Sequence, residues 1–142
     1  ALRARHDGPT VRHVALLYPM VDPACATGSM HEFARGHLLA RDCVQWAWSQ
    51  YLSEPADATN RLVSLLHAEL AAFPPTSVVT AECDPLRDEG EAFAARLRAA
   101  GVEVIARRYL GMVHGFAALP QLTPVASTAI DDVAADIRKS IA

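Results

Sequence analysis

The sequence has few of the features that would place a protein on nucleic acid or in a membrane. It contains a single lysine, Lys139, has no run of basic residues, and carries a net charge of −3 over 142 residues. A basic surface is the usual electrostatic footprint of a nucleic-acid-binding protein, so we expect no nucleic-acid partner. No apolar stretch reaches the roughly 20 residues of a membrane span, and no signal peptide opens the chain. We therefore predict a cytoplasmic protein without a membrane span.

The residue spacings of a metal site are also missing. The three cysteines, Cys25, Cys43 and Cys83, are too far apart for a CxxC pair, and no HExxH pattern occurs. We interpret the cysteines as reduced and mostly buried thiols of a cytoplasmic protein, and we expect neither a metal nor a cofactor. Hydrophobic residues make up 51% of the chain, which is enough to bury a core.

Apolar runs alternate with helical patterns along the chain. Strands are expected at residues 14–18, 77–81 and 102–109, and helices at the end of 1–6 and over 41–52, 88–100 and 124–141. This order predicts an α/β fold of about three parallel strands with flanking helices. Residues 20–73 form an irregular and helical insertion, and residues 74–142 form a βαβα segment. The whole of 1–142 is expected to be one partial domain.

Two chemically suggestive residues follow neighbouring strands of this predicted sheet. Asp84 comes after the second strand, and His114 follows the third. Function in open α/β sheets gathers beyond the carboxyl ends of the strands, so these side chains are expected to meet. A carboxylate beside a histidine orients the ring and stabilises the imidazolium in a catalytic triad. The alternatives are a helix-capping role for Asp84 and a satisfied loop histidine at position 114.

The surrounding motifs resemble the hormone-sensitive-lipase-like esterases, a family of α/β hydrolases. The resemblance rests on Asp-Pro-Leu-Arg-Asp-Glu-Gly at 84–90 and Gly-Met-Val-His-Gly-Phe at 111–116, with Leu-Tyr-Pro at 17–19 and Pro-Pro at 74–75. It runs nearly end to end. It implies that Asp84 is the triad acid, that His114 is the triad base, and that residues 20–73 belong to a cap over the acyl pocket. The implied activity is serine-dependent hydrolysis of short to medium acyl carboxylic esters.

The same resemblance identifies what the sequence lacks. The family carries a Gly-Asp-Ser-Ala-Gly nucleophile elbow and an earlier His-Gly-Gly oxyanion loop, and neither motif, nor any Gly-x-Ser-x-Gly, occurs in this chain. We therefore expect the chain to be the C-terminal part of a longer natural protein, called the parent protein below. The partner that completes the site would be the N-terminal half with the serine and the oxyanion loop, and the substrate would be a small ester.

A second hypothesis is that the chain is not catalytic. It would then be a fragment, or half of a split assembly, that acts only through association. Without a neighbouring strand, residues 14–18 would form an apolar sheet edge, so we expect self-association there. Acyl transfer to an alcohol instead of water would use the same residues as hydrolysis.

Three apolar residues flank the predicted acid and base. Leu86, Val113 and Phe116 are candidates for the lining of the acyl pocket, although core packing explains them equally well. Asp88 and Glu91 have the spacing of a helix capping box, so we assign Asp88 a structural role as N-cap.

Overall fold

Three parallel strands form the centre of the molecule. The structure, a computed structural model, describes residues 8–71 and 73–142. The helix end expected over residues 1–6 lies outside the described residues. The elements are β1 (Val14–Leu17), α2 (Gly28–Glu32), α3 (Arg41–Tyr51), the 3-10 turns η1 (Pro55–Thr59) and η2 (Leu65–His67), β2 (Thr76–Cys83), α4 (Arg87–Ala99), β3 (Val104–Val113), the 3-10 turn η3 (Phe116–Ala118) and α5 (Val125–Ile141).

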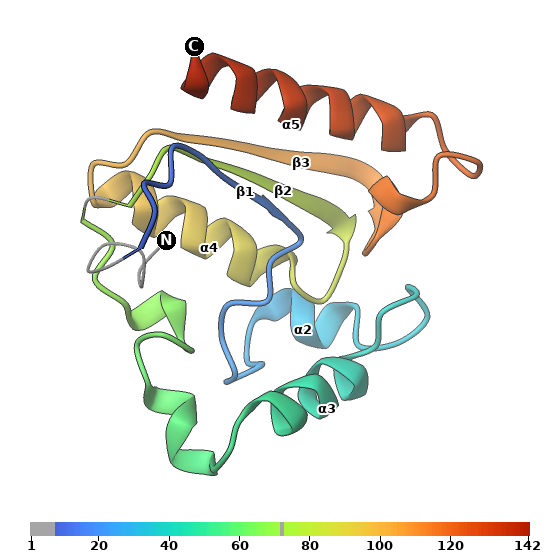
Figure 1. Cartoon of the computed structure of the whole chain (residues 1–142). Helices are drawn as coiled ribbons and strands as arrows, with labels where there is room; N and C mark the ends of the chain where they lie inside the picture. The colour runs from blue at the N-terminus through green and yellow to red at the C-terminus, as the bar shows by residue number, and fades with distance from the viewer. Residues whose placement is uncertain (1–7, 72) are drawn as a thin grey trace.

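The sheet has the order β1-β2-β3, with both pairings parallel. Helix α4 covers one face and α5 covers the other, while α2 and α3 lie together beyond the ends of the strands (Figure 1). Residues 76–81 of β2 are buried because this central strand has a neighbour on each side and a helix on each face. The predicted layers, and the connection of β2 to β3 through a helix, are confirmed.

The core divides into three clusters, which follow this layering. Val79, Phe116 and Val133 pack between the sheet and α5, and Phe93 and Leu97 of α4 pack on the opposite face. Burying a side chain such as Phe93 contributes about 1.5–3 kcal/mol. The third cluster joins residues 20–73 to the loop after β2; its buried members are Cys25, Met30, Val44, Trp48 and Leu86. The insertion is therefore packed onto the loop that carries Asp84.

Several local expectations need correction. Strand β3 continues to Val113 instead of ending at Tyr109, and residues 28–32 of the insertion form a short helix. Helix α3 buries Val44 and Trp48, whereas Tyr51 is 67% exposed. Helix α5 begins one residue later than expected, and Thr123 Oγ1 accepts the Val125 N–H at 3.3 Å.

A polar network attaches α5 to the sheet at the end of the strands that lies opposite the loops after Cys83 and Val113. Asp136 of α5 accepts hydrogen bonds from Ser77 Oγ at 2.8 Å and from Arg107 Nη2 at 2.9 Å. His13 is half-buried and lies within hydrogen-bond distance of the Ser77 and Ser140 hydroxyls. The Arg107 hydrogen bond is the main reason that the pKa of Asp136 is lowered. The network fixes α5 over the sheet without bearing on the loops after Cys83 and Val113.

Strand β1 forms one edge of the described sheet. Val14 and Tyr18 donate their N–H groups to Pro75 and Val79 of the β2 side. Because donors alternate along a strand, the N–H groups of Ala15 and Leu17 point away from β2. Within residues 8–71 and 73–142, no strand pairs with that side, so β1 presents an unpaired edge.

We predict that the polypeptide 1–142, expressed alone, associates through this edge. Ala15→Pro removes an outward N–H and leaves the β1–β2 ladder intact, so it should shift the chain toward monomer. Ala15→Val, which keeps the N–H, is the matched control. Size-exclusion chromatography with light scattering measures the result. A wild-type chain that is a stable monomer with cooperative unfolding would contradict the prediction.

Candidate active site

An irregularity in β3 brings the two predicted residues together. The β2–β3 register pairs Ala81 with Tyr109 but Cys83 with Val113, so one residue of β2 faces three of β3. Gly111 lies in this bulge with a φ of 70°, and its N–H donates to Glu82 Oε2 at 2.6 Å. A glycine adopts this backbone conformation at little cost. Because Cys83 and Val113 are paired, the residues that follow them, Asp84 and His114, lie side by side.

Asp84 and His114 are in direct contact. His114 Nδ1 lies 2.9 Å from Asp84 Oδ2, and since an ionised carboxylate only accepts, the ring nitrogen donates. The second carboxylate oxygen of Asp84 accepts the N–H of Leu86 at 2.9 Å. The Asp84 side chain is 1% exposed and that of His114 is 27% exposed. The acid is thus buried with both oxygens engaged, while the ring that it orients reaches solvent.

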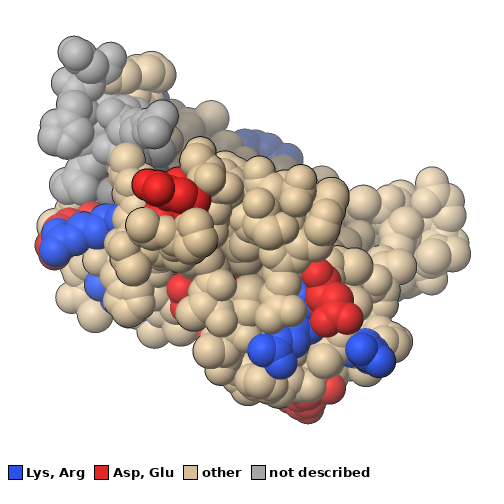
Figure 2. All heavy atoms as spheres, turned by 90° about the horizontal axis from the view of Figure 1, so that it is seen from below, with Lys and Arg blue, Asp and Glu red and all other residues tan. Residues whose placement is uncertain are grey.

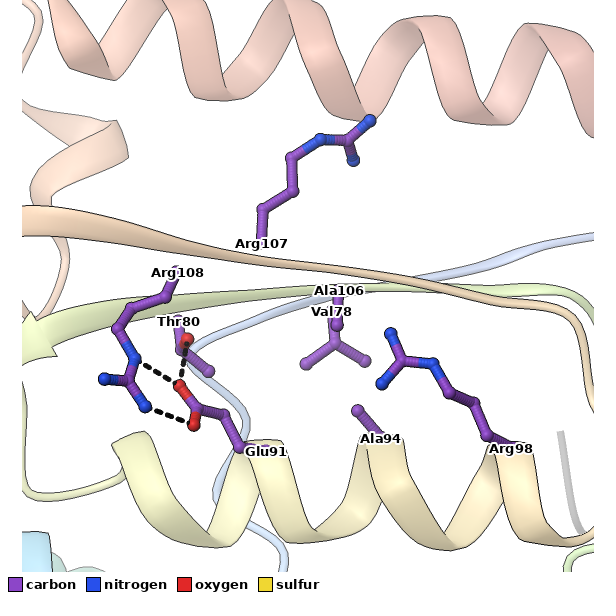
Figure 3. A pocket seen from close by; sticks show the side chains of 8 residues that line it. All are labelled: Val78, Thr80, Glu91, Ala94, Arg98, Ala106, Arg107 and Arg108. Atoms are coloured by element: carbon purple, nitrogen blue, oxygen red, sulfur yellow. Dashed lines mark hydrogen bonds and ion pairs between the residues drawn. The ribbon is translucent and has the colours of Figure 1, made fainter.

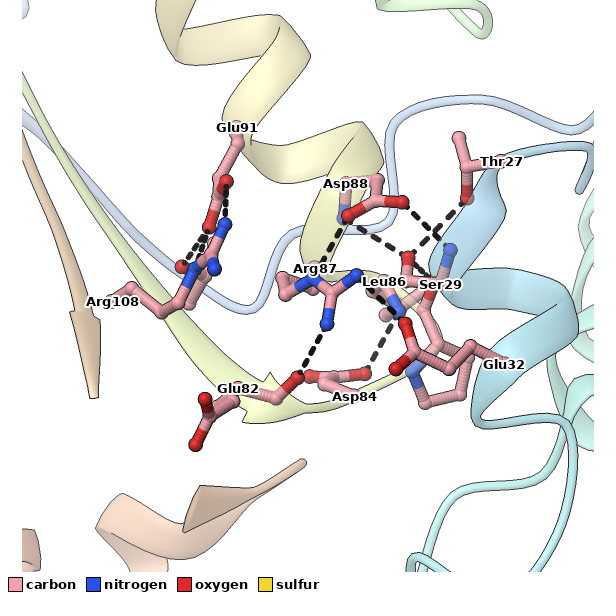
Figure 4. Close-up of polar contacts among 12 residues, drawn as sticks. Thr27, Ser29, Glu32, Glu82, Asp84, Leu86, Arg87, Asp88, Glu91 and Arg108 are labelled. Atoms are coloured by element: carbon pink, nitrogen blue, oxygen red, sulfur yellow. Dashed lines mark hydrogen bonds and ion pairs between the residues drawn. The ribbon is translucent and has the colours of Figure 1, made fainter. Parts of the chain in front are cut away.

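Helix α2 of the insertion binds the loop after β2 that contains Asp84 (Figure 4). Ser29, which is fully buried, donates its hydroxyl to the Pro85 carbonyl at 2.8 Å and its N–H to Asp88 Oδ2 at 2.7 Å. The Asp88 N–H donates back to Ser29 Oγ at 3.0 Å. Arg87 reaches from the same loop to Glu32 of α2 at 3.0 Å. Ser29 therefore fixes the backbone on both sides of Leu86, and Glu32 adds an ion pair with the Arg87 side chain.

The predicted N-cap role of Asp88 is wrong. Helix α4 begins at Arg87, and its N-cap residue is Leu86, which makes no side-chain capping bond. Asp88 lies in the first turn, where its carboxylate binds the Arg87 guanidinium at 2.8 Å and the Ser29 N–H. These bonds outweigh the cost of desolvation and lower its pKa. Glu91, the other half of the predicted capping box, binds Arg108 instead.

Glu89 is a buried carboxyl group that the sequence did not distinguish from its acidic neighbours. It is 0% exposed, and its Oε1 accepts the N–H groups of Val21 at 2.7 Å and Asp22 at 3.3 Å. Oε2 has no hydrogen-bond partner among the described residues. Desolvation raises the pKa of Glu89 to about 7, against the effect of the two hydrogen bonds. Glu89 therefore fixes the chain just after β1 and takes up a proton near neutral pH.

This raised pKa predicts a pH-dependent stability. A carboxyl group with a pKa of 4.5 when unfolded and about 7 when folded binds its proton more tightly in the native state. Its contribution is complete below pH 4.5 and is lost as the pH rises through 7. Glu89→Gln should therefore be more stable than wild type above pH 7, by a few kcal/mol, and the advantage should vanish near pH 5. Urea unfolding of the parent protein at pH 5 and 8 measures it; a difference that is independent of pH would contradict the prediction.

The three candidates for the acyl pocket lie in different surroundings. Leu86 and Phe116 are each 2% exposed, the first packed against the insertion and the second between the sheet and α5. Val113 is half-buried at the end of β3. Packing accounts for the positions of Leu86 and Phe116, and contact with an acyl chain stays a prediction for all three.

The surface beside α4 is a second candidate site, and its polar groups are already paired. A cavity of about 380 Å³ lies between α4 and the strands, lined by Val78, Thr80, Glu91, Ala94, Arg98, Ala106, Arg107 and Arg108. Glu91 accepts hydrogen bonds from Arg108 and Thr80, and Arg107 extends toward α5 (Figure 3). Neither Asp84 nor His114 lines this cavity. We therefore assign no chemistry to it.

Neither the surface charge seen from one side nor the metal-ligating side chains of the described residues indicate a further site. On the face shown in Figure 2, acidic and basic side chains are interspersed instead of forming a patch of one sign. Residues 8–71 and 73–142 contain no group of three His, Cys, Asp or Glu side chains placed to hold a metal. No helix among the same residues is long and apolar enough to cross a membrane.

Comparison with protein families gives a match over most of the chain. Residues 1–118 match a family model described as the alpha/beta hydrolase fold. The carboxylic ester hydrolase LipN of Mycobacterium tuberculosis is 44% identical over 126 residues, which cover 84% of this chain and 33% of LipN. The ethyl acetate hydrolase of Pseudomonas putida is 34% identical over 116 residues, or 81% of this chain and 36% of that enzyme.

Solved structures give the same result. An esterase of the hyperthermophilic archaeon Pyrobaculum calidifontis superposes with a TM-score of 0.92 at 36% identity, covering 98% of this chain and 47% of the esterase. A thermostable esterase of Pseudomonas putida gives a TM-score of 0.88 at 38% identity, over 93% of this chain and 43% of that protein. The chain thus spans between a third and a half of the length of the relatives that it matches.

Proposed function

Because the chain belongs to the hormone-sensitive-lipase-like family of α/β hydrolases, whose relatives include carboxylic ester hydrolases, we propose that its parent protein is a serine-dependent carboxylesterase. In this proposal Asp84 is the triad acid and His114 is the base. The single observation that carries it is the 2.9 Å contact between these side chains at two adjacent strand ends. The nucleophilic serine and the oxyanion loop come from the part of the parent protein that this chain does not contain.

The geometry supports the following division of labour. With Nδ1 held by Asp84, Nε2 of His114 is the nitrogen that takes the proton of the serine hydroxyl as its oxygen attacks the ester carbonyl. The imidazolium that forms is stabilised by the buried carboxylate and then protonates the leaving alcohol. A water molecule, deprotonated by the same ring, hydrolyses the acyl-enzyme and regenerates the serine. Transfer of the acyl group to an alcohol differs only in this second step.

The proposal gives the insertion and its neighbours a role in substrate choice. Residues 20–73 would cover the acyl pocket as a cap, and Leu86, Val113 and Phe116 would contribute to its wall. Short to medium acyl chains are the expected substrates. Of the three free cysteines only Cys25 is buried, while Cys43 is exposed and Cys83 is half-buried, so the expectation of mostly buried thiols is wrong. Their unpaired state supports a cytoplasmic location as part of the same proposal.

One observation favours the alternative for the isolated chain. The open edge of β1 makes polypeptide 1–142 suited to association with another chain, so by itself it would be a non-catalytic fragment or half of a split assembly. In both proposals, an active enzyme requires a serine that is supplied from outside residues 1–142.

Turnover of p-nitrophenyl acetate and butyrate tests both proposals. We expect the parent protein to hydrolyse these esters and polypeptide 1–142 to be inactive. An inactive parent protein would refute the esterase proposal. Robust turnover by polypeptide 1–142 would show instead that the nucleophile lies within this chain. Competition between water and an alcohol acceptor would then separate hydrolysis from acyl transfer.

A further inference from the structure

Tyr18 has a strained backbone directly after β1. Its φ of 43° lies in the left-handed region, which is unfavourable for an aromatic residue and is retained only where the surroundings require it. Its N–H continues the ladder by donating to the Val79 carbonyl at 2.7 Å. The conformation therefore directs the side chain without releasing the strand. Such a strained position beside a candidate site suggests that the direction of this side chain has a function.

The Tyr18 side chain contacts the His114 loop at two points. Its ring lies 4.9 Å from the His114 ring, centroid to centroid, at an interplanar angle of 55°. Its hydroxyl oxygen accepts the N–H of Ala117 at 3.0 Å. A third contact places the ring 5.7 Å from the Phe116 ring. One side chain from β1 thus holds both the histidine ring and the backbone three residues later.

We propose that Tyr18 is a positioning residue for His114; this rests on the proposed function. A single hydrogen bond donated to Asp84 fixes one ring nitrogen but leaves the plane of the imidazole free to rotate about that contact. The Tyr18 ring closes one side of the imidazole and restricts this rotation. The Ala117 hydrogen bond holds the loop that Gly115, with a φ of 77°, would otherwise leave flexible. Residues that follow three adjacent strands then meet at one histidine. His114 follows β3, Asp84 follows β2 and accepts its hydrogen bond, and Tyr18 follows β1 and restricts the rotation of its ring.

The contact also has an electrostatic consequence. The face of an aromatic ring carries partial negative charge and attracts a nearby cation. The Tyr18 ring would therefore favour the imidazolium that forms during catalysis, together with the Asp84 carboxylate. Burial raises the pKa of the Tyr18 hydroxyl, so it stays neutral in the pH range where the histidine works.

Core packing alone is the competing explanation, and Tyr109 provides the matched control. Tyr109 belongs to the same cluster, lies 5.2 Å from the Phe116 ring, and donates its hydroxyl to Asp132. Among the described residues, the Tyr109 ring stacks on Phe116 and the ring that stacks on His114 is that of Tyr18. Tyr109→Leu therefore removes comparable packing from the same cluster without touching the base.

The test compares Tyr18→Phe, Tyr18→Leu and Tyr109→Leu in the parent protein. We expect Tyr18→Leu to lower kcat by roughly 10–100-fold with little change in KM, as is typical of a misplaced catalytic group. Tyr18→Phe keeps the ring and should stay within about 5-fold of wild type, as should Tyr109→Leu. Tyr18→Asn, which tolerates a positive φ, replaces the leucine variant if that variant does not fold. Equal losses in Tyr18→Leu and Tyr109→Leu, or a phenylalanine variant as slow as the leucine variant, would overturn the proposal.

A spectroscopic readout separates this proposal from the proposed function. The Nδ1–H of His114 that bonds Asp84 gives a downfield proton resonance, which His114→Ala assigns. We expect the resonance to be lost or broadened in Tyr18→Leu and retained in Tyr18→Phe and Tyr109→Leu, whether or not the parent protein hydrolyses esters. An unchanged resonance in Tyr18→Leu would refute the positioning role of Tyr18. The expected spectra without any ester turnover would refute only the esterase proposal.

Discussion

His114→Ala in the parent protein is expected to reduce kcat for p-nitrophenyl butyrate by about 10⁴-fold or more. In the proposed mechanism the ring accepts the serine proton through Nε2 and later protonates the leaving alcohol. Alanine supplies neither function, and the remaining rate would come from substrate binding and the oxyanion donors. Initial rates at saturating ester measure the loss, with circular dichroism to confirm folding.

His13→Gln is the matched control for this variant. His13 is also half-buried and bonded to hydroxyl groups, but it lies at the opposite end of the same sheet, between Ser77 and Ser140. Glutamine keeps hydrogen-bonding atoms there, so kcat should stay within about 3-fold of wild type while stability falls by about 1 kcal/mol. A His114→Ala variant that retains a tenth of the wild-type kcat would remove the histidine from the proposed mechanism.

The meeting of Asp84 and His114 could be predicted because it follows from topology. Two parallel strands joined through a helix end at the same edge of a sheet, so residues just after them become neighbours whatever their intervening sequence. What the pattern could not supply was the register. Gly111 and Glu82 create a bulge that extends β3 to Val113, and without it the histidine would not follow the residue paired with Cys83.

The contacts of Ser29 and Tyr18 could not be predicted from the sequence, for a different reason. Ser29 acts through hydrogen bonds to residues 56 and 59 positions away, and the short helix that presents it has no hydrophobic repeat to reveal it. Tyr18 looked like the end of an apolar strand. No local pattern encodes its φ of 43° or its contacts with the His114 and Phe116 rings, which lie far along the chain.

The capping-box error has a different origin. Asp88 and Glu91 have the right spacing for a local capping box, but each carboxylate pairs with an arginine instead. Asp88 binds the adjacent Arg87, and Glu91 binds Arg108 on β3. These charge-assisted bonds exceed what a neutral backbone N–H offers, so ion pairing outweighs the capping pattern at both positions.

Asp84→Asn is expected to reduce kcat by about 10⁴-fold while leaving the fold nearly intact. Both carboxylate oxygens of Asp84 accept hydrogen bonds, one from the Leu86 N–H and one from His114 Nδ1. An asparagine has one oxygen and one amide group. The amide cannot face the Leu86 N–H, since two donors would meet, so it must face His114. There it donates to Nδ1 and forces the proton onto Nε2, the nitrogen that should accept the serine proton.

Asp88→Asn distinguishes this tautomer effect from damage to the loop. Asp88 lies four residues further along, its carboxylate is equally occupied, by Arg87 and Ser29, and it does not touch His114. Replacing it weakens the ion pair and the contact with α2, so stability should fall by about 1–2 kcal/mol while kcat stays within a few-fold. The opposite pattern, an active Asp84→Asn beside an inactive Asp88→Asn, would mean that the loop matters through its packing and that Asp84 is not the triad acid. The hydrogen-bond geometry favours the first pattern because Asp84 alone joins the helix α4 entrance to the histidine ring.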